Sequence, residues 1–88
     1  MGEAYVEMFT SPGCVGCPFV KKMLKEISDK LRNEDITIEE VDITVDTTRA
    51  FQYDIMSVPA VAINGVLKFV GVPNKEELEK AIIEGLEE

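Results

Sequence analysis

The sequence contains no histidine, no tryptophan and only two cysteines among 88 residues. Without histidine, the chain lacks the side chain that most often serves as a general base or metal ligand near neutral pH. Basic residues are also few, because nine Lys and Arg face seventeen Asp and Glu, for a net charge of −8. This charge repels phosphate backbones and anionic lipid head groups. We therefore expect neither nucleic acid nor a membrane as a partner.

Long hydrophobic runs are absent as well. The longest apolar stretch, Val58 to Ile63, is too short to span a bilayer. The opening Met1-Gly2-Glu3-Ala4 has neither the basic nor the apolar region of a secretory signal, and Val6 stands where a myristoylation motif needs Ser or Thr. We expect a soluble cytoplasmic protein whose residues 1–88 form a single domain.

Hydrophobic periodicity predicts an alternating series of strands and helices. Strands are predicted over residues 4–10, 36–42, 60–63 and 66–70. A helix follows the cysteines to about residue 31, a short one runs from Asp46 to about Tyr53, and a third follows Asn74, with Asp46 and Asn74 as N-caps. Asn64-Gly65 predicts a tight hairpin between the last two strands.

The resulting order, βαβαββα, belongs to the α/β class. Two strands joined through a helix should lie parallel, whereas the last two should form an antiparallel hairpin. We therefore expect a central four-stranded mixed sheet with helices on both faces.

The two cysteines, Cys14 and Cys17, form a C-x-x-C motif. A disulfide across so small a loop adds little stability, so the pair needs a chemical explanation. Near a helix start, unpaired N–H groups and the helix dipole stabilise a thiolate, which makes Cys14 the predicted nucleophile. Cys17, one turn along, is the predicted resolving thiol that attacks the mixed disulfide of Cys14. Gly13 and Gly16 leave both sulfurs uncrowded.

Other uses of the same cysteines remain open from the residues alone. Two thiolates are half of a tetrahedral zinc site, and copper(I) also accepts two sulfurs, but the chain offers no histidine and no third cysteine. A dimer could hold an iron–sulfur cluster through Cys14 of each subunit together with external thiols. A metal or iron–sulfur carrier is thus the alternative function, and a protein-interaction module is a third possibility.

The motifs together resemble the thioredoxin/glutaredoxin superfamily, most closely the small glutaredoxin-like thioredoxins of archaea. The resemblance rests on Ser-Pro-Gly-Cys-Val-Gly-Cys-Pro at 11–18, the segment 53–60 that ends in Val-Pro-Ala, and Ile-Asn-Gly at 63–65 followed by Phe69 and Gly71. It implies a thioredoxin-like fold and a monomeric thiol–disulfide oxidoreductase for electron transport and cell redox homeostasis. Its substrates would be protein disulfides, and its reductant would be a thioredoxin-reductase-like protein or another dithiol carrier. The Cys14–Cys17 disulfide would be its only redox group, with no added cofactor or metal.

The resemblance also assigns a role to Val58 and Pro59. The matching proline in the family is cis and faces the cysteine pair, although only about 5–6% of X–Pro bonds in folded proteins are cis. We therefore expect a cis Val58–Pro59 bond that shapes the substrate site. By the same resemblance, the Val58 backbone would bind an extended substrate segment in the manner of strand addition.

Several positions depart from the family pattern. Gly13 replaces a tryptophan, and Val15-Gly16 replaces Gly-Pro between the cysteines. The acid that many thioredoxins carry on the first strand aligns with Met8, and Glu7 should point to the opposite face. Half of the glutathione-binding pattern of glutaredoxins is missing, because a single Gly71 stands where two glycines are usual.

Charged and aromatic residues near the motif have simpler interpretations. We expect Lys21 and Lys22 to lie on the solvated face of the helix and the run Glu39-Glu40-Val41-Asp42 to form a solvated strand end. Phe19 has two equal interpretations, as part of a docking surface or of the core.

Overall fold

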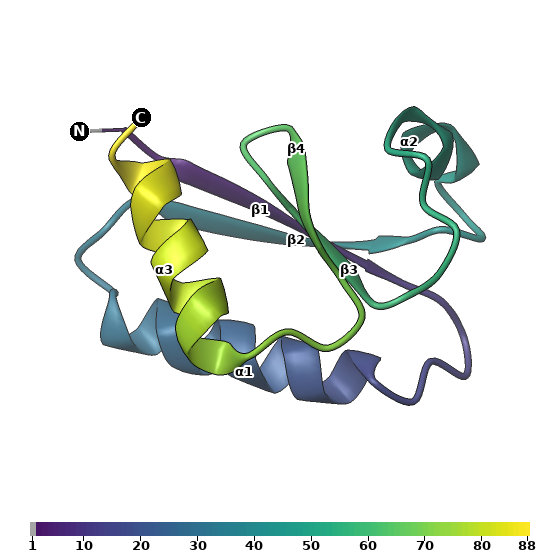
Figure 1. The fold of residues 1–88 in the computed structure, drawn as a ribbon, viewed down its shortest axis with the longest axis horizontal. Helices are drawn as coiled ribbons and strands as arrows, with labels where there is room; N and C mark the ends of the chain where they lie inside the picture. The colour runs from purple at the N-terminus through teal and green to yellow at the C-terminus, as the bar shows by residue number, and fades with distance from the viewer. Residues whose placement is uncertain (1) are drawn as a thin grey trace.

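The computed structural model describes residues 2–88, which form seven elements in the predicted order (Figure 1). The strands are β1 (Ala4–Thr10), β2 (Ile36–Asp42), β3 (Ala60–Ile63) and β4 (Val66–Val70). The helices are α1 (Cys17–Lys30), α2 (Thr47–Gln52) and α3 (Lys75–Leu86). The predicted bounds of all four strands and the predicted caps of α2 and α3 are confirmed.

The four strands form one mixed sheet in the order β2-β1-β3-β4. β1 runs parallel to β2 and antiparallel to β3, and β3 pairs antiparallel with β4. The parallel pairing follows from the crossover through α1, and the hairpin follows from the two-residue turn. Asn64 and Gly65 have φ of 51° and 84°, the positive values that a type I′ turn requires.

Two hydrophobic layers lie on opposite faces of the sheet. α1 and α3 cover one face, and α2 lies on the other, toward one end of the sheet (Figure 1). Alternation along β1 sends Val6 and Met8 into the layer of α1 and α3, and Phe9 into the layer of α2. The three-layer arrangement predicted from the sequence is confirmed.

Spacing of three and four residues explains the buried face of α1. Val20, Leu24 and Ile27 of this helix are buried, whereas the lysines between them are exposed. Asn74 is the N-cap of α3, and its side chain accepts hydrogen bonds from the backbone N–H groups of Glu76 and Glu77. Of the helices in residues 2–88, none is both long and apolar enough to cross a membrane.

Candidate active site

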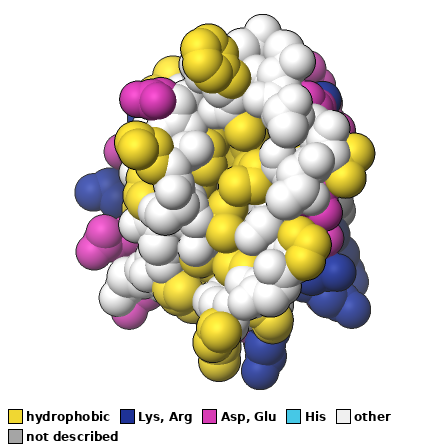
Figure 2. Space-filling model, turned by 90° about the vertical axis from the view of Figure 1, so that its right-hand side faces the viewer, with side chains coloured by type: hydrophobic (Ala, Val, Ile, Leu, Met, Phe, Trp, Pro, Cys, Tyr) yellow, Lys and Arg dark blue, Asp and Glu magenta, His cyan; other side chains and the backbone are white. Residues whose placement is uncertain are grey.

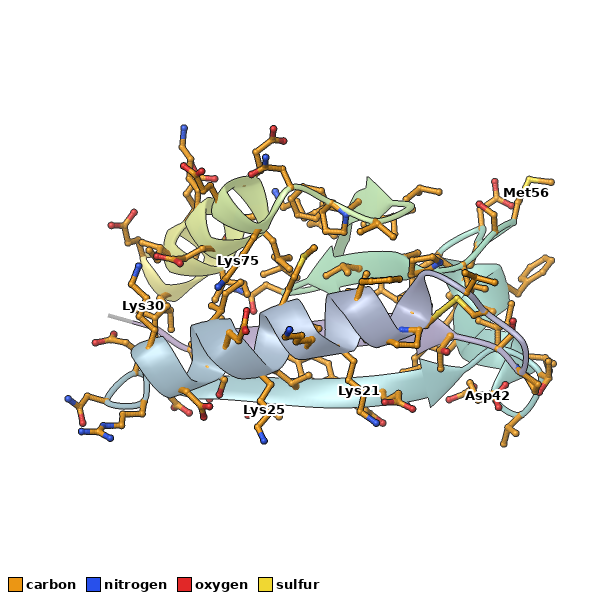
Figure 3. All side chains as sticks on the ribbon, turned by 90° about the horizontal axis from the view of Figure 1, so that it is seen from below. Lys21, Lys25, Lys30, Asp42, Met56 and Lys75 are labelled. Carbon is orange, nitrogen blue, oxygen red and sulfur yellow. A yellow bond between two sulfur atoms is a disulfide. The ribbon has the colours of Figure 1, made fainter. Side chains whose placement is uncertain are left out.

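Cys14 and Cys17 form a disulfide at the N-terminal end of α1, with their Cα atoms 5.5 Å apart (Figure 3). The helix begins at Cys17, with Gly16 as its N-cap and Pro18 in its first turn, so Cys14 lies in the preceding loop. The Gly16 carbonyl accepts the first helical hydrogen bond, from the backbone N–H of Val20 at 3.3 Å. The motif therefore spans the helix start, and only its second cysteine is helical.

The two sulfurs differ in their access to solvent. Cys17 is 5% exposed and belongs to the core layer between the sheet and α1. Cys14 is only partly buried and packs against the edge of that layer. Cys14 is therefore the more accessible of the two cysteines to a molecule in solution.

Pro59 lies directly against the C-x-x-C loop. The Val58–Pro59 peptide bond is cis, as predicted. A Cβ atom placed on Gly16 would lie 3.2 Å from Cδ of Pro59 and 2.7 Å from Cγ2 of Val72. The loop before β3, the segment after β4 and the cysteine loop therefore meet at one place. The carbonyl of buried Pro59 accepts a 2.7 Å hydrogen bond from the N–H of Gly71, which ties two of these segments together.

Exposed hydrophobic side chains surround this meeting point. Val15 is 85% exposed, Phe19 61% and Val72 50%, so the position of Phe19 is on the surface and not in the core. Met56, in the loop before Pro59, is 88% exposed and points away from the same end of the molecule (Figure 3). Figure 2 shows this end with hydrophobic side chains gathered across it. Large exposed side chains of this kind form an apolar surface suited to contact with another protein.

An open cavity of about 310 Å³ lies beside the disulfide on the face of the sheet that α1 covers. Both cysteines, Met8, Lys21 and Glu40 are among its lining residues. Lys21 Nζ lies 3.3 Å from a carboxylate oxygen of Glu40, and Figure 3 shows Lys21 extending from α1 toward β2. The expectation of two merely solvated charges is thus incomplete, because both are exposed yet paired beside the cysteines.

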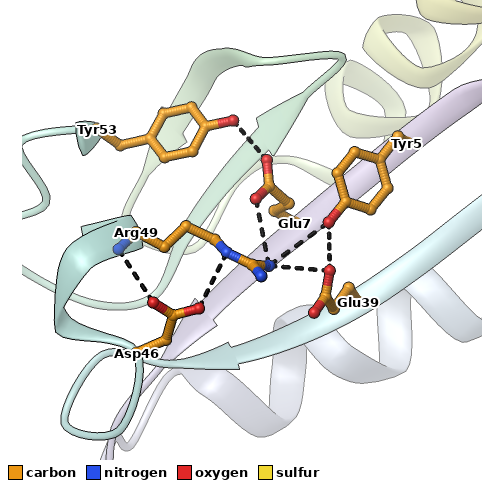
Figure 4. Close-up of polar contacts among 6 residues, drawn as sticks. All are labelled: Tyr5, Glu7, Glu39, Asp46, Arg49 and Tyr53. Carbon is orange, nitrogen blue, oxygen red and sulfur yellow. Dashed lines mark hydrogen bonds and ion pairs between the residues drawn. The ribbon is translucent and has the colours of Figure 1, made fainter. Parts of the chain in front are cut away.

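Glu7 points to the opposite face of the sheet, as predicted, and joins a network with α2 (Figure 4). Its side chain is 5% exposed and accepts a 2.5 Å hydrogen bond from Tyr53 Oη. Arg49 Nη1 lies 3.5 Å from Glu7 and 2.9 Å from Glu39, and Arg49 Nε lies 3.1 Å from Asp46. Sequence reasoning missed this network, because its members are far apart in the chain.

The network shifts the titration of its members. The pKa of Tyr53 is raised to about 12, mainly by burial and, second, by the hydrogen bond to Glu7. The hydrogen bond from Tyr5 lowers the pKa of Glu39, and Arg49 lowers it further. Tyr53 therefore stays protonated, and Glu39 stays ionised, over the physiological range.

The metal alternative can be compared with the side-chain positions. Within residues 2–88, no three Cys, Asp or Glu side chains gather closely enough to hold a metal ion. Cys14 and Cys17 therefore have no third or fourth protein ligand in the described chain.

Comparisons with known proteins agree with this site. The model of the thioredoxin-domain family matches residues 5–83. A probable thioredoxin of Methanothermobacter thermautotrophicus is 44% identical over 93% of this chain and 95% of its own. A thioredoxin of Methanocaldococcus jannaschii is 35% identical over the same shares of the two chains.

Solved structures show the same fold. A protein disulfide oxidoreductase from Aeropyrum pernix superposes with a TM-score of 0.83 at 28% identity, over 98% of this chain but only 38% of that longer protein. Mitochondrial thioredoxin 3 of Saccharomyces cerevisiae gives a TM-score of 0.78 at 19% identity, over 96% of this chain and 80% of its own, which shows the fold alone.

A C-x-x-C disulfide at the start of a helix, facing a cis proline on this α/β sheet, defines a thiol–disulfide oxidoreductase. The chain belongs to the thioredoxin-domain family. Membership of this family implies two general kinds of partner, a disulfide substrate and a reductant.

Proposed function

We propose that this protein reduces disulfides in other proteins, with Cys14 as the nucleophile and Cys17 as the resolving thiol. The observation that carries the assignment is the difference in burial, since Cys17 is 5% exposed and Cys14 is the more accessible. The redox group in this proposal is the Cys14–Cys17 pair, without an additional cofactor or metal.

The reaction proceeds by two thiol–disulfide exchanges. The Cys14 thiolate attacks one sulfur of the substrate disulfide, forms a mixed disulfide with it and releases the other substrate sulfur as a thiolate. Cys17 then gives up its proton and attacks Cys14, which forms the disulfide seen in the structure and releases the first substrate sulfur. Two electrons pass to the substrate, and a dithiol carrier or a thioredoxin-reductase-like protein restores the reduced pair.

Val58 and Pro59 form the substrate-binding part of the proposed site. Within residues 2–88, the backbone N–H and carbonyl of Val58 make no hydrogen bond inside the chain. These groups are therefore free to pair with an extended substrate segment. The exposed side chains of Val15, Phe19 and Val72 would contact apolar parts of the same protein substrate.

We propose that residues 1–88 act as a single, monomeric domain in the cytoplasm. The net charge of −8 gives no attraction for nucleic acid or anionic lipid. A cytoplasmic setting suits a dithiol that must be returned to its reduced form after each turnover.

Trapping of the mixed disulfide tests these roles. Reduced Cys17→Ser protein is incubated with a disulfide-containing protein such as insulin and analysed by non-reducing mass spectrometry. We expect a covalent adduct on Cys14, none with Cys14→Ser under the same conditions, and catalytic reduction of insulin by the unmodified protein. An equal adduct on Cys17 of the Cys14→Ser protein would reverse the assignment, and failure of the unmodified protein to reduce insulin would refute the substrate class.

A further inference from the structure

Resolution of the mixed disulfide requires the buried Cys17 to lose a proton. Apolar surroundings disfavour the charged thiolate, and Cys17 lies in the core layer together with Met8. Glu7 cannot take this proton, because its carboxylate lies on the other face of the sheet and bonds to Tyr53. A proton acceptor must therefore be reached from the face on which Cys17 lies.

Glu40 is placed on that face by the register of the sheet. β1 pairs parallel with β2 so that Met8 lies beside Glu40, and paired residues of neighbouring strands share a face. Glu40 lines the same cavity as Cys17 and Cys14. Besides the two cysteines, the ionisable residues among those that line this cavity are Lys21 and Glu40.

The cavity connects these groups through solvent. Its volume of about 310 Å³ is ample for water, since one water molecule occupies roughly 30 Å³ in the liquid. A general base can act on its proton directly or through one water molecule. The Glu40 side chain is 49% exposed, so its carboxylate can pass a proton on to bulk solvent.

We propose that Glu40 accepts the proton of Cys17 during resolution, through water in this cavity, and that Lys21 holds its carboxylate in place. This inference rests on the proposed function and adds a proton-accepting residue to it. The Cys17 S–H bond breaks, its proton passes to Glu40 and its electron pair forms the bond to Cys14. The bond between Cys14 and the substrate breaks, and the substrate thiolate leaves with the electron pair of that broken bond. When the disulfide is reduced again, Cys17 takes up a proton.

Other charges near Glu40 come from α1. Lys21, Lys25 and Asp29 line a second hollow of about 340 Å³ together with Glu40, and the two hollows share Met8, Lys21 and Glu40. Lys21 is the nearest, as its 3.3 Å ion pair shows. The pH profile of any variant at position 40 therefore includes the influence of these three groups.

Glu40→Gln separates proton transfer from simple electrostatics, because the two predict opposite signs. Removal of a negative charge near Cys17 should favour its thiolate and speed resolution if Glu40 acts only as a charge. If Glu40 accepts the proton, its loss should instead slow resolution near pH 7. We expect the rate of resolution to fall about tenfold. This is less than the loss expected for a general base enclosed in a site, because solvent can partly replace an exposed carboxylate.

Stopped-flow reaction with a neutral dipyridyl disulfide resolves the two steps. The first thiopyridone release reports attack by Cys14, and the second reports resolution by Cys17. A neutral reagent avoids any effect of the changed protein charge on binding. We expect Glu40→Gln to slow only the second phase below about pH 8 and to converge with the unmodified protein at higher pH, where hydroxide removes the proton. Glu40→Asp should restore part of the rate.

Glu26→Gln is the matched control. It removes one carboxylate from the exposed ion pair of Glu26 with Lys75, whose charged atoms lie 2.9 Å apart. Glu26 belongs to α1, as Lys21 does, but lines neither hollow. Both phases should stay at the rate of the unmodified protein. A second phase in Glu40→Gln that is unchanged or faster, in a protein with unaltered circular dichroism, would overturn the role of Glu40. A first phase that keeps the rate of the unmodified protein in Cys14→Ser would instead refute the role of Cys14 in the proposed function.

Discussion

Gly16 and Pro59 touch across the active site so closely that a Cβ atom at position 16 would lie 3.2 Å from Cδ of the proline. The same atom would lie 2.7 Å from Cγ2 of Val72. The backbone at Gly16 has φ −81° and ψ −17°, which any residue can adopt. Space, and not backbone conformation, therefore favours glycine at this position.

Gly16→Ala should therefore push the cysteine loop away from Pro59. We expect a loss of about 1–3 kcal/mol in the free energy of unfolding, as for other overpacked sites, and slower reduction of protein substrates. Urea denaturation and insulin reduction measure the two effects. Val72→Ala in the same chain removes the 2.7 Å contact and should recover part of the loss. Equal stability of Gly16→Ala and the unmodified protein would show that the contact is not restrictive.

Sequence patterns predicted the elements of this fold well, because each depends on neighbours in the chain. The alternation in β1, the three- and four-residue spacing in α1 and the Asn64-Gly65 turn are local signals. The cysteine pair was equally visible as a motif. The cis Val58–Pro59 bond came from family resemblance, since no local physical rule requires it.

Contacts between layers could not be predicted in this way. The proximity of Lys21 and Glu40 depends on the exact register that sets Met8 beside Glu40. The free-energy cost of burying the Glu7 carboxylate is offset by its ion pair with Arg49 and its hydrogen bond from Tyr53, which lie in and directly after α2. Both features join residues more than fifteen positions apart, and their polar sequences look like ordinary solvated segments.

The difference in burial between the two cysteines predicts unequal alkylation. In the reduced protein, Cys14 should react with iodoacetamide much faster than Cys17, which is 5% exposed in the oxidised structure. Proximity to the start of α1 should also move the thiolate pKa of Cys14 well below the free value of about 8.5. Mass spectrometry of each cysteine over a pH series measures both. Equal, slow labelling of both with unshifted pKa values would contradict the redox assignment and favour a metal-binding role.

Arg49 stabilises the network on the opposite face, and its removal should be costly. Arg49→Met leaves the buried Glu7 carboxylate with Tyr53 as its partner and removes both other ion pairs. We expect a loss of about 2–4 kcal/mol in the free energy of unfolding, because an uncompensated buried charge remains. Lys75→Met is the control, since it breaks an exposed pair with Glu26 that is worth less than about 1 kcal/mol. Similar losses in both variants would show that burial of Glu7 adds nothing.

Tyr53 should make the stability of the protein fall at alkaline pH. Its pKa is raised to about 12 in the folded state from the ordinary value of 10.0, so the folded protein holds the phenolic proton more tightly than the unfolded chain. The corresponding stability is fully present below pH 10 and is lost as the pH rises toward 12.

Tyr53→Phe removes that titration along with the hydrogen bond to Glu7. At neutral pH the variant should lose about 1–3 kcal/mol, because the buried carboxylate loses a donor. Between pH 10 and about 12 its stability should decline less steeply than that of the unmodified protein, since the shifted phenol is absent. Denaturant titrations across this range give both quantities. Parallel alkaline profiles for the two proteins would mean that Tyr53 titrates in the folded state as it does in the unfolded chain. Equal stability at neutral pH would mean that its bond to Glu7 contributes nothing.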